Sequence, residues 1–343
     1  MSPEERFELI KRNTAEIVPE DELLELLKAK EHPVAYIGNA PTGRIHIGYY
    51  FWISKVADFL KAGFKFKILL ADLHAHLDDQ KAPFELLDAR VEYYKEVLTA
   101  MLESLDIDIS NLEFVRGTDF QLEKDYTLDV YKLSALNTFS RCKKAASEVV
   151  RFGEHPKLSG FIYPILQALD EVYLNADVQF GGMDQRKILM FARENLPKIG
   201  YKPRIEVMTP LMVGLSGDKM SASDAKSKID VLDSPEEVTS KIKSAYCVAG
   251  EVEGNGLLDF VRQVIMPYKQ DKGLPFVIER PEKFGGNIEY ISYKDLENDF
   301  AAKKLHPLDL KSAVAKDLNL LLDHVRKSVN LDTVKRAYPE NEH

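Results

Sequence analysis

Residues 38–49 read GNAPTGRIHIGY, after an apolar run at residues 34–38 and before an apolar-patterned stretch at residues 46–60. This order predicts a buried strand, a turn rich in Gly and Pro, and a helix. Such a turn leaves free backbone N–H groups at the start of the helix, which favours a phosphate there. His46 would lie in the first helical turn and donate to a phosphate oxygen, and Gly48 would let a flat base approach the backbone. A structural turn with a surface histidine and a packing glycine explains the segment equally well.

Short apolar runs alternate with helix-patterned segments on both sides of this turn. Strands are predicted at residues 66–71, 112–115, 178–180 and 205–208. Helices are predicted at residues 84–104, 126–139 and 158–174, and from Asp184 onward, with an acidic helix-patterned lead over residues 3–30. The alternation indicates βαβ units, so we expect an α/β protein with a parallel sheet.

The pattern changes near residue 230. Helices are then predicted at residues 234–246, 292–303 and 308–328, with turn-rich pieces around Pro281 and Gly285. We therefore expect two domains, residues 1–230 and a mostly helical domain over residues 231–343. The last dozen residues are polar and are expected to be frayed.

Composition excludes several classes of protein. The chain has 343 residues, 45% of them hydrophobic and 29% charged, with a net charge of −9, which is typical of a folded globular protein and not of a general DNA-coating one. No apolar run approaches the roughly 20 residues of a membrane span, and residues 1–12 lack the apolar core of a signal peptide. The two cysteines, Cys142 and Cys247, are too few for a disulfide framework or a four-cysteine zinc site. We expect a cytoplasmic protein without a bound metal.

One predicted helix carries three polar residues on a single face. Tyr163, Gln167 and Asp170 are spaced four and three apart within residues 158–174. They form either a satisfied core network or the lining of a pocket for a polar small molecule. Pro164 disfavours helical geometry at Tyr163, so the helix is expected to start or kink there.

Two loops contain the glycines that permit close approach of a ligand. Residues 181–187, GGMDQRK, follow a predicted strand, and Asp184 lies where an acidic side chain binds sugar hydroxyls in parallel sheets. A diglycine turn with a capping aspartate is the equally simple alternative. Residues 214–223, GLSGDKMSAS, carry a lysine and hydroxyl groups that can follow a pyrophosphate. An ordinary polar surface loop has the same composition.

Two of these segments also carry a family resemblance. Residues 46–49, HIGY, stand where class I aminoacyl-tRNA synthetases have the HIGH motif, and residues 219–223, KMSAS, stand where they have KMSKS. The stretches ILLADLHAHLDD, GTDFQLEKDYTLDVYKLS, IYPILQALDEVYL and FGGMDQRKI resemble tyrosyl-tRNA synthetases of the archaeal and eukaryotic-cytosolic type. The resemblance covers about residues 5–330. It implies a Rossmann-type catalytic domain over residues 1–230 with an acceptor-stem-binding insertion, a helical anticodon-binding domain over residues 231–343, and a homodimer.

The resemblance also implies a reaction. L-tyrosine is activated with ATP to tyrosyl-AMP and pyrophosphate and is then transferred to the 3′ end of tRNA(Tyr). ATP is a substrate, Mg²⁺ accompanies it, and no cofactor is tightly bound. His46 and Lys219 are the implied catalytic residues. The implied tyrosine-binding residues are Tyr36, His74, Tyr163, Gln167, Asp170 and Gln185; those for ATP are Gly38, His46, Gly48, Asp184, Lys219 and Ser221. For tRNA they are Lys144 and Arg186 at the acceptor stem, and Phe284, His306 and Asp309 at the anticodon.

Two positions depart from the family pattern. Tyr49 replaces the second histidine of HIGH, and Ala222 replaces the second lysine of KMSKS. Both changes remove a donor or a positive charge from the ATP site, which leaves open how much charge the loop neutralises. The alternatives are a tryptophanyl-tRNA synthetase, a small-molecule adenylyltransferase, and a non-aminoacylating RNA-binding paralogue.

Overall fold

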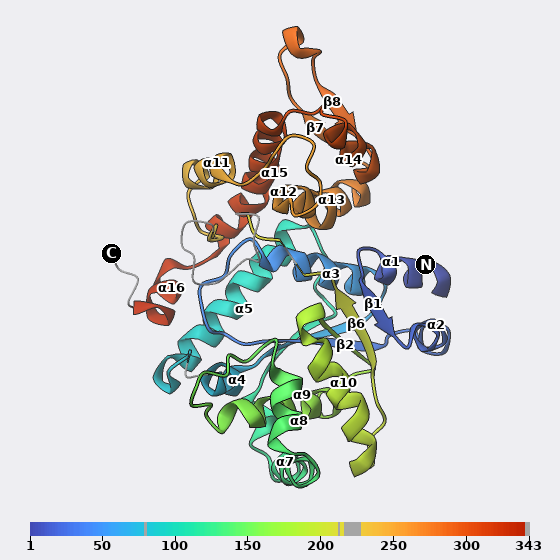
Figure 1. Cartoon of the computed structure of the whole chain (residues 1–343), viewed down its shortest axis with the longest axis vertical. Coiled ribbons are helices and arrows are strands. Elements are labelled where there is room, and N and C mark those ends of the chain that lie inside the picture. The colour runs from blue at the N-terminus through green and yellow to red at the C-terminus, as the bar shows by residue number, and fades with distance from the viewer. Residues whose placement is uncertain (79–80, 212, 216–227, 340–343) are drawn as a thin grey trace.

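The computed structural model describes residues 1–78, 81–211, 213–215 and 228–339. Its main sheet has the strands β1 (Glu16–Val18), β2 (Val34–Asn39), β3 (Lys65–Leu70), β4 (Leu112–Arg116), β5 (Val178–Gly182) and β6 (Ile205–Thr209). Their order is β1-β6-β5-β2-β3-β4. Figure 1 labels β1, β6 and β2 of this sheet. All neighbours pair in parallel except β1, which pairs antiparallel with β6 at one edge. The predicted α/β class with a parallel sheet is confirmed.

Helices connect the strands and cover the sheet. They are α1 (Pro3–Lys11), α2 (Glu20–Ala29), α3 (Tyr49–Lys61), α4 (Asp72–Leu77), α5 (Leu87–Ser104), α6 (Thr118–Gln121), α7 (Lys124–Leu136), α8 (Phe139–Ala146), α9 (Ser159–Tyr173) and α10 (Arg186–Asn195). None of the helices in the described ranges is long and apolar enough to cross a membrane.

Alternate strand residues face two different cores, as the two-residue period of a strand requires. Phe66 and Ile68 belong to the large core that also holds apolar residues of α3 and α5. Tyr36 and Leu69 pack on the opposite side, in a separate cluster with Leu174 just beyond α9. Tyr36 therefore points to the side of the sheet that α9 covers.

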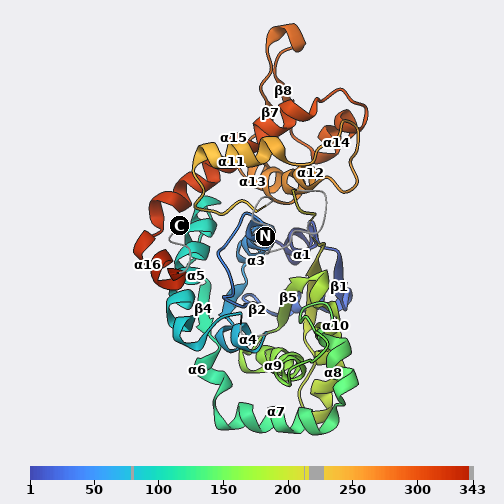
Figure 2. The ribbon, with the colours of Figure 1, turned by 60° about the vertical axis from the view of Figure 1, so that its left-hand side comes forward.

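The chain after residue 230 forms a mostly helical region with one hairpin. Its elements are α11 (Pro235–Ser244), α12 (Gly256–Phe260), a π-helical turn (Val261–Ile265), α13 (Met266–Asp271), the antiparallel strands β7 (Phe276–Ile278) and β8 (Ile288–Tyr290), α14 (Tyr293–Ala301), α15 (Pro307–Ser328) and α16 (Leu331–Ala337). The hairpin projects at one end of the molecule, and α7 runs across the other end (Figure 2). A boundary at residues 230 and 231 stays a prediction.

The expectation of a frayed C-terminus is wrong for residues 332–338. Val334, Ala337 and Tyr338 are buried, and the guanidinium of Arg90 on α5 lies 4.8 Å from the centre of the Tyr338 ring. Nε of Arg90 also donates to the carbonyl of Ala337 (3.3 Å). A few apolar side chains within a polar segment are enough to dock it when a neighbouring helix offers a partner.

Local expectations also need correction in the lead and in two helices. The lead over residues 3–30 is interrupted by β1, because β6 offers a free sheet edge that no helical pattern reveals. The helix predicted over residues 126–139 ends at Leu136, and a new one begins after Thr138, whose side chain caps it. In α9, Pro164 is the sixth residue of an uninterrupted helix. Pro164 has no N–H to donate to the carbonyl of Gly160, so the helix continues past one missing bond near its start.

Candidate active site

A cavity of about 340 Å³ opens where β2 and β5 end. From β2 the chain proceeds outward through β3 and β4, whereas β5 and β6 lie on the other side, so this is the point at which the strand order reverses. Ligands of open α/β sheets bind at such a point, outside the carboxyl ends of the strands. Six of the predicted site residues line the cavity: Gly38, His46, Gly48, Gln167, Asp184 and Gln185.

The turn that carries His46 is held by a distant segment of the chain. His46 forms a β-bridge with Asp230, and the N–H of Ile47 donates to the carbonyl of Ile229 (3.0 Å). Nη2 of Arg44 donates to Oδ1 of Asp230 (3.2 Å). Helix α3 consequently begins only at Tyr49. The prediction that His46 lies in the first helical turn is wrong, because its backbone pairs with Asp230 and the helix begins three residues later.

His46 is a neutral donor in this turn. Burial, together with the positive charge of Lys228, lowers the pKa of His46 to about 4. Its Nδ1 accepts the backbone N–H of Gly48 (3.1 Å), so in the neutral ring the proton is on Nε2. The ring of Tyr49 stands edge-on to His46 at 5.2 Å, and its hydroxyl bonds that of Tyr94 (3.1 Å). Tyr49 therefore supports the histidine ring through packing.

The diglycine at the end of β5 makes room for two polar side chains. A Cβ on Gly182 would lie 2.6 Å from Oδ1 of Asp184, and a Cβ on Gly181 would lie 3.2 Å from the side chain of Gln185. Both side chains thus fold back against the strand end. Nε2 of Gln167 on α9 donates to Oε1 of Gln185 (3.0 Å), which joins two of the predicted tyrosine-binding residues.

The other predicted tyrosine-binding residues form a buried polar cluster. Tyr36, His74, Tyr163 and Asp170 are all at most 8% exposed, and Asp170 is 1% exposed. The ring of His74 stands edge-on to that of Tyr163 at 4.6 Å, and its Nε2 lies 3.8 Å from Oδ2 of Asp170. The hydroxyl of Tyr36 lies 3.5 Å from the carbonyl of Gln167, which connects this cluster to the cavity wall. The structure therefore brings all six predicted tyrosine-binding residues into one region.

Two further residues hold Asp170, and the sequence reasoning assigned them no role. Nε2 of Gln121 and the hydroxyl of Tyr126 both donate to Oδ1 of Asp170, at 2.7 and 2.8 Å. Gly117 leaves space for this arrangement, because a Cβ there would lie 2.6 Å from Oε1 of Gln121 and 2.8 Å from Oδ1 of Asp72. No local pattern in the run GTDFQLEKDY marks Gln121 and Tyr126, because the carboxylate that they hold lies 44 to 49 residues further along the chain.

Burial decides the protonation of this cluster. It raises the pKa of Asp170 to about 7, although the bonds from Gln121 and Tyr126 oppose the increase. Burial lowers the pKa of His74 to about 4, so the ring is neutral at pH 7 and its contact with Asp170 is not an ion pair. Burial also raises the pKa of Tyr36 far above its usual value, which keeps the hydroxyl protonated.

The His74 ring also has unused hydrogen-bonding capacity. The Nδ1 of His74 lies 3.5 Å from the amide nitrogen of Gln121, which can only donate. Nδ1 is then the acceptor, and the proton of the neutral ring is on the Nε2 of His74. Among the described residues, Nε2 of His74 and Oε1 of Gln121 are buried without a hydrogen-bond partner. A donor on His74 and an acceptor on Asp170 thus lie side by side, which suits a group that can both donate and accept.

The remaining predicted residues lie away from this region or outside the described residues. Lys219 and Ser221 lie outside the described residues. Lys144 is exposed on α8, whereas the guanidinium of Arg186 forms two bonds to Glu16 on β1, at 2.6 and 2.8 Å. In the C-terminal region Phe284 is 63% exposed in the hairpin loop, and His306 and Asp309 lie at the start of α15. Their predicted roles in tRNA binding stay predictions. No group of three His, Cys, Asp or Glu side chains in the described ranges is placed to hold a metal ion.

Comparisons with known proteins agree with this geometry. The model of the family "tRNA synthetases class I (W and Y)" matches residues 28–323. The chain is 49% identical over 342 residues to tyrosine–tRNA ligase of Haloarcula marismortui, and the match covers 99% of each chain. It is 51% identical over 341 residues to the cytoplasmic tyrosine–tRNA ligase of Gallus gallus, covering 98% of this chain and 64% of that relative, so it spans less than two thirds of the vertebrate protein.

A solved structure has the same fold. Tyrosyl-tRNA synthetase of Archaeoglobus fulgidus, crystallised with L-tyrosine, superposes with a TM-score of 0.90 at 45% identity. That match covers 96% of this chain and all of the other one. The family model and the archaeal relative both cover most of the sequence, and the chain therefore belongs to the class I tRNA synthetases of the tryptophan and tyrosine family.

Proposed function

We propose that the chain is a tyrosine–tRNA ligase. It activates L-tyrosine with ATP to tyrosyl-AMP and pyrophosphate and transfers the tyrosyl group to the 3′ end of tRNA(Tyr). ATP is a substrate, accompanied by Mg²⁺, and no resident cofactor is required. The proposal includes a cytoplasmic location, in keeping with the cytoplasmic tyrosine–tRNA ligase among its relatives.

The observation that carries the proposal is the pairing of Asp170 with the Nε2–H of His74, 3.8 Å apart in a buried cluster next to the cavity. A phenol hydroxyl donates to the carboxylate and accepts from the imidazole at the same time. Phenylalanine offers neither interaction, and the indole N–H of tryptophan only donates. Leaving a buried polar group unpaired costs roughly 1–3 kcal/mol, so the cluster favours tyrosine over both.

The rest of the cavity suits the first reaction step. The tyrosine carboxylate attacks the α-phosphate of ATP, so both reactants are anionic and catalysis depends on alignment and on donors aimed at the phosphate. Gln167 and Gln185 are placed to hold the amino acid, and the Nε2–H of the neutral His46 donates to a phosphate oxygen. Because Gly38 and Gly48 have no side chains, the nucleotide can come close to the backbone there, and Asp184 offers a carboxylate to the hydroxyls of the ribose.

Pyrophosphate exchange with single amino acids tests the first step. We expect ATP–pyrophosphate exchange that depends on tyrosine and is at least about a hundredfold weaker with tryptophan or phenylalanine. Preference for tryptophan would support the tryptophanyl alternative. If no amino acid supports pyrophosphate exchange, the result would favour a non-aminoacylating RNA-binding paralogue.

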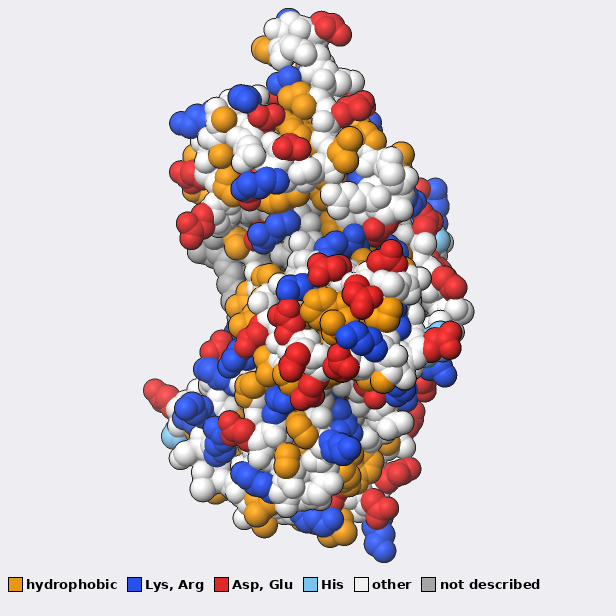
Figure 3. Space-filling view, turned by 90° about the vertical axis from the view of Figure 1, so that its right-hand side faces the viewer, with side chains coloured by type: hydrophobic (Ala, Val, Ile, Leu, Met, Phe, Trp, Pro, Cys, Tyr) orange, Lys and Arg blue, Asp and Glu red, His pale blue; other side chains and the backbone are white. Residues whose placement is uncertain are grey.

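The proposal assigns tRNA to both ends of the molecule. Lys144 and Arg186 bind the acceptor stem, and Phe284, His306 and Asp309 meet the anticodon. Cationic and anionic side chains are interspersed on the face seen in Figure 3, so tRNA would be bound by local basic surface and not by the charge of the whole chain. We expect tRNA charging to weaken steeply with salt, whereas tyrosine-dependent pyrophosphate exchange responds little. Equal salt dependence of the two reactions would contradict this assignment.

The proposal also includes a homodimer. The α7 region exposes large apolar side chains, which a second copy of the chain would cover. They are Leu122, Leu128, Tyr131, Leu136 and Phe139, each between 48% and 67% exposed. Sedimentation of the wild type and of Tyr131→Glu tests this, with a dimer expected for the first and a monomer for the second. A wild-type monomer at micromolar concentration would exclude it.

A further inference from the structure

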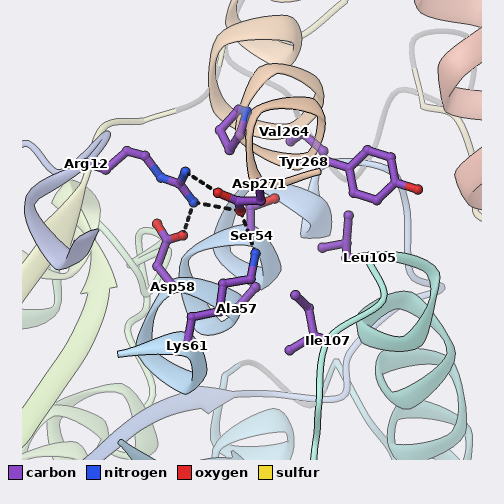
Figure 4. A pocket seen from close by; sticks show the side chains of 11 residues that line it. Arg12, Ser54, Ala57, Asp58, Lys61, Leu105, Ile107, Val264, Tyr268 and Asp271 are labelled. Carbon is purple, nitrogen blue, oxygen red and sulfur yellow. Dashed lines mark hydrogen bonds and ion pairs between the residues drawn. The ribbon is translucent and has the colours of Figure 1, made fainter. Parts of the chain in front are cut away.

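Helix α3 connects the candidate active site with the C-terminal region. It begins at Tyr49, directly after the turn that carries His46, and ends at Lys61. Its second half meets two other elements, the end of α1 and helix α13 of the C-terminal region (Figure 4). One rigid helix thus runs from the candidate ATP site to the place where the two parts of the molecule join.

Arg12 links all three elements at this joint. Its Nη1 and Nη2 bond the two oxygens of Asp271 on α13, at 2.9 and 3.2 Å, and its Nη2 also pairs with Asp58 on α3. Lys61 on α3 pairs with the same Asp271. The side chain of Asp58 is only 5% exposed and that of Arg12 is 23% exposed, so solvent screens these charges less than those of surface pairs. A two-pronged guanidinium bond also defines an orientation, which a single contact does not.

Asn13 makes the second contact across the joint. Its Nδ2 donates to the carbonyl of Arg262 (3.1 Å), which lies in the π-helical turn of the C-terminal region. A π turn departs from the regular helical bonding pattern, and such turns are frequent at functional sites. Asn13 has φ = 54°, a left-handed conformation that asparagine tolerates better than most residues. The residue type thus suits both the backbone and the contact.

The segment that carries Arg12 and Asn13 is itself fixed to α3. Lys55, which is 3% exposed, donates to the carbonyl of Ile10 (3.0 Å) and to that of Arg12. Apolar packing closes the joint beside these bonds, with the rings of Phe51 and Phe260 5.8 Å apart. The end of α1 is therefore held on the catalytic side and reaches across to the C-terminal side.

We propose that Arg12 and Asn13 are positioning residues that set the C-terminal region relative to the candidate active site, so that a tRNA held at the far end presents its 3′ end to the adenylate. The inference rests on the proposed function. Adenylate formation needs only the cavity, whereas charging needs both ends of the molecule in register. Loosening the joint would then impair the second step selectively.

The test uses Asp271→Asn combined with Asn13→Gly in the full-length chain. Asp271→Asn keeps the shape of the side chain and weakens its bonds to Arg12, and glycine accepts the positive φ at position 13 while removing the amide. The matched control is Glu20→Gln, which removes the neighbouring Lys11–Glu20 pair that does not cross the joint.

The first readout compares the two reactions. We expect kcat/KM for tRNA charging to fall about tenfold to a hundredfold, because small misplacements of reacting groups cost rate on that scale. Tyrosine-dependent pyrophosphate exchange should stay unchanged within about twofold. The control should alter neither. Equal losses in both reactions, or no loss of charging, would overturn the proposal.

The second readout does not depend on activity. Spin labels at Glu25→Cys on α2 and Lys294→Cys on α14, in a chain with Cys142→Ala and Cys247→Ser, report the distance across the joint when the labelled chain is diluted with an excess of unlabelled chain, which removes distances between two copies. Glu25 and Lys294 are both more than 70% exposed. We expect a broader distance distribution in the double variant than in the control. Identical distributions would contradict the proposed positioning role of Arg12 and Asn13. If the wild type catalysed no pyrophosphate exchange, the proposed function would be wrong. The distance distributions would still show whether Arg12 and Asn13 hold the two parts of the molecule in place.

Discussion

Two aspartates of the helices that cover the sheet, Asp170 on α9 and Asp129 on α7, differ in how their hydrogen bonds shift the pKa of the carboxyl group. Asp170 accepts from Gln121 and Tyr126, whereas Asp129 accepts from Tyr173 (3.0 Å), Tyr201 (2.5 Å) and Lys132 (2.7 Å). Both are at most 3% exposed, and the rings of Tyr126 and Tyr173 lie 4.8 Å apart. They differ in depth as well as in the lysine, because Asp170 is enclosed by protein on all sides, whereas Asp129 lies close to the surface beside Lys132, whose side chain is 49% exposed.

The pKa of the two carboxyl groups shifts in opposite directions. Burial raises that of Asp170 to about 7. Burial also tends to raise that of Asp129, but the bonds from Lys132, Tyr201 and Tyr173 together lower it below its usual value. Asp170 lies so deep that its two neutral donors do not offset the loss of solvation, whereas at the shallower Asp129 a cation and two hydroxyl groups do. Asp129 is consequently a satisfied structural group, while Asp170 retains capacity for a ligand.

The largest expected difference concerns amino-acid selectivity. Asp170→Ala should reduce the preference for tyrosine over phenylalanine by about a hundredfold or more, because the phenol loses its buried acceptor. Sites of this kind reject phenylalanine roughly 10⁵-fold, and tyrosyl-tRNA synthetase is itself the standard example of that figure. The ratio of kcat/KM in pyrophosphate exchange measures the change. Asp129→Ala should leave the ratio intact, and a similar loss in both variants would remove the distinction between the two groups.

The next difference concerns stability and pH. The folded-state pKa of Asp170 is raised. The contribution of its carboxyl group to the free energy of unfolding is therefore fully present below the unfolded pKa near 4 and is lost as the pH rises to about 7. Asp170→Asn should therefore gain stability relative to the wild type by about 2 kcal/mol between pH 5 and 7.5. The folded-state pKa of Asp129 is lowered, so its carboxylate stabilises the fold above about pH 4, and this stabilisation is lost as the pH falls further. Urea unfolding of the two Asn variants at several pH values would refute the comparison if their pH trends ran in parallel.

The smallest difference concerns single donors. Tyr126→Phe removes one bond to ionised Asp170 and should move the pH midpoint of the KM for tyrosine upward by roughly half to one unit. In the wild type, KM should fall as pH rises through about 7, because the ionised carboxylate of Asp170 accepts a hydrogen bond from the phenol hydroxyl of the substrate. Besides burial, the groups that set this midpoint are Gln121, Tyr126 and Asp72, and His74 and Tyr36 also face Asp170. Tyr173→Phe is the matched control, and an equal shift in it would argue against a specific role for Tyr126.

The candidate site was predictable where its residues lie in continuous segments. Tyr163, Gln167 and Asp170 share one face of α9, and Asp184 and Gln185 follow the diglycine, so spacing alone grouped each set. The position of His46 was not predictable, since a bridge to Asp230 delays the start of α3. Gln121 and Tyr126 were missed as well, because nothing near them in the chain reveals the carboxylate 44 to 49 residues away that they hold.

The sequence by itself determined the alternation of strands and helices, the class of the sheet and the identity of the segments at its carboxyl edge, because hydrophobic periodicity and turn chemistry act over a few residues. Only the tertiary structure decided the docking of α16, the joint at Arg12 and the protonation of Asp170. Each of these depends on which distant groups exclude water from a side chain or offer it a hydrogen bond, and such neighbours exist only once the chain has folded.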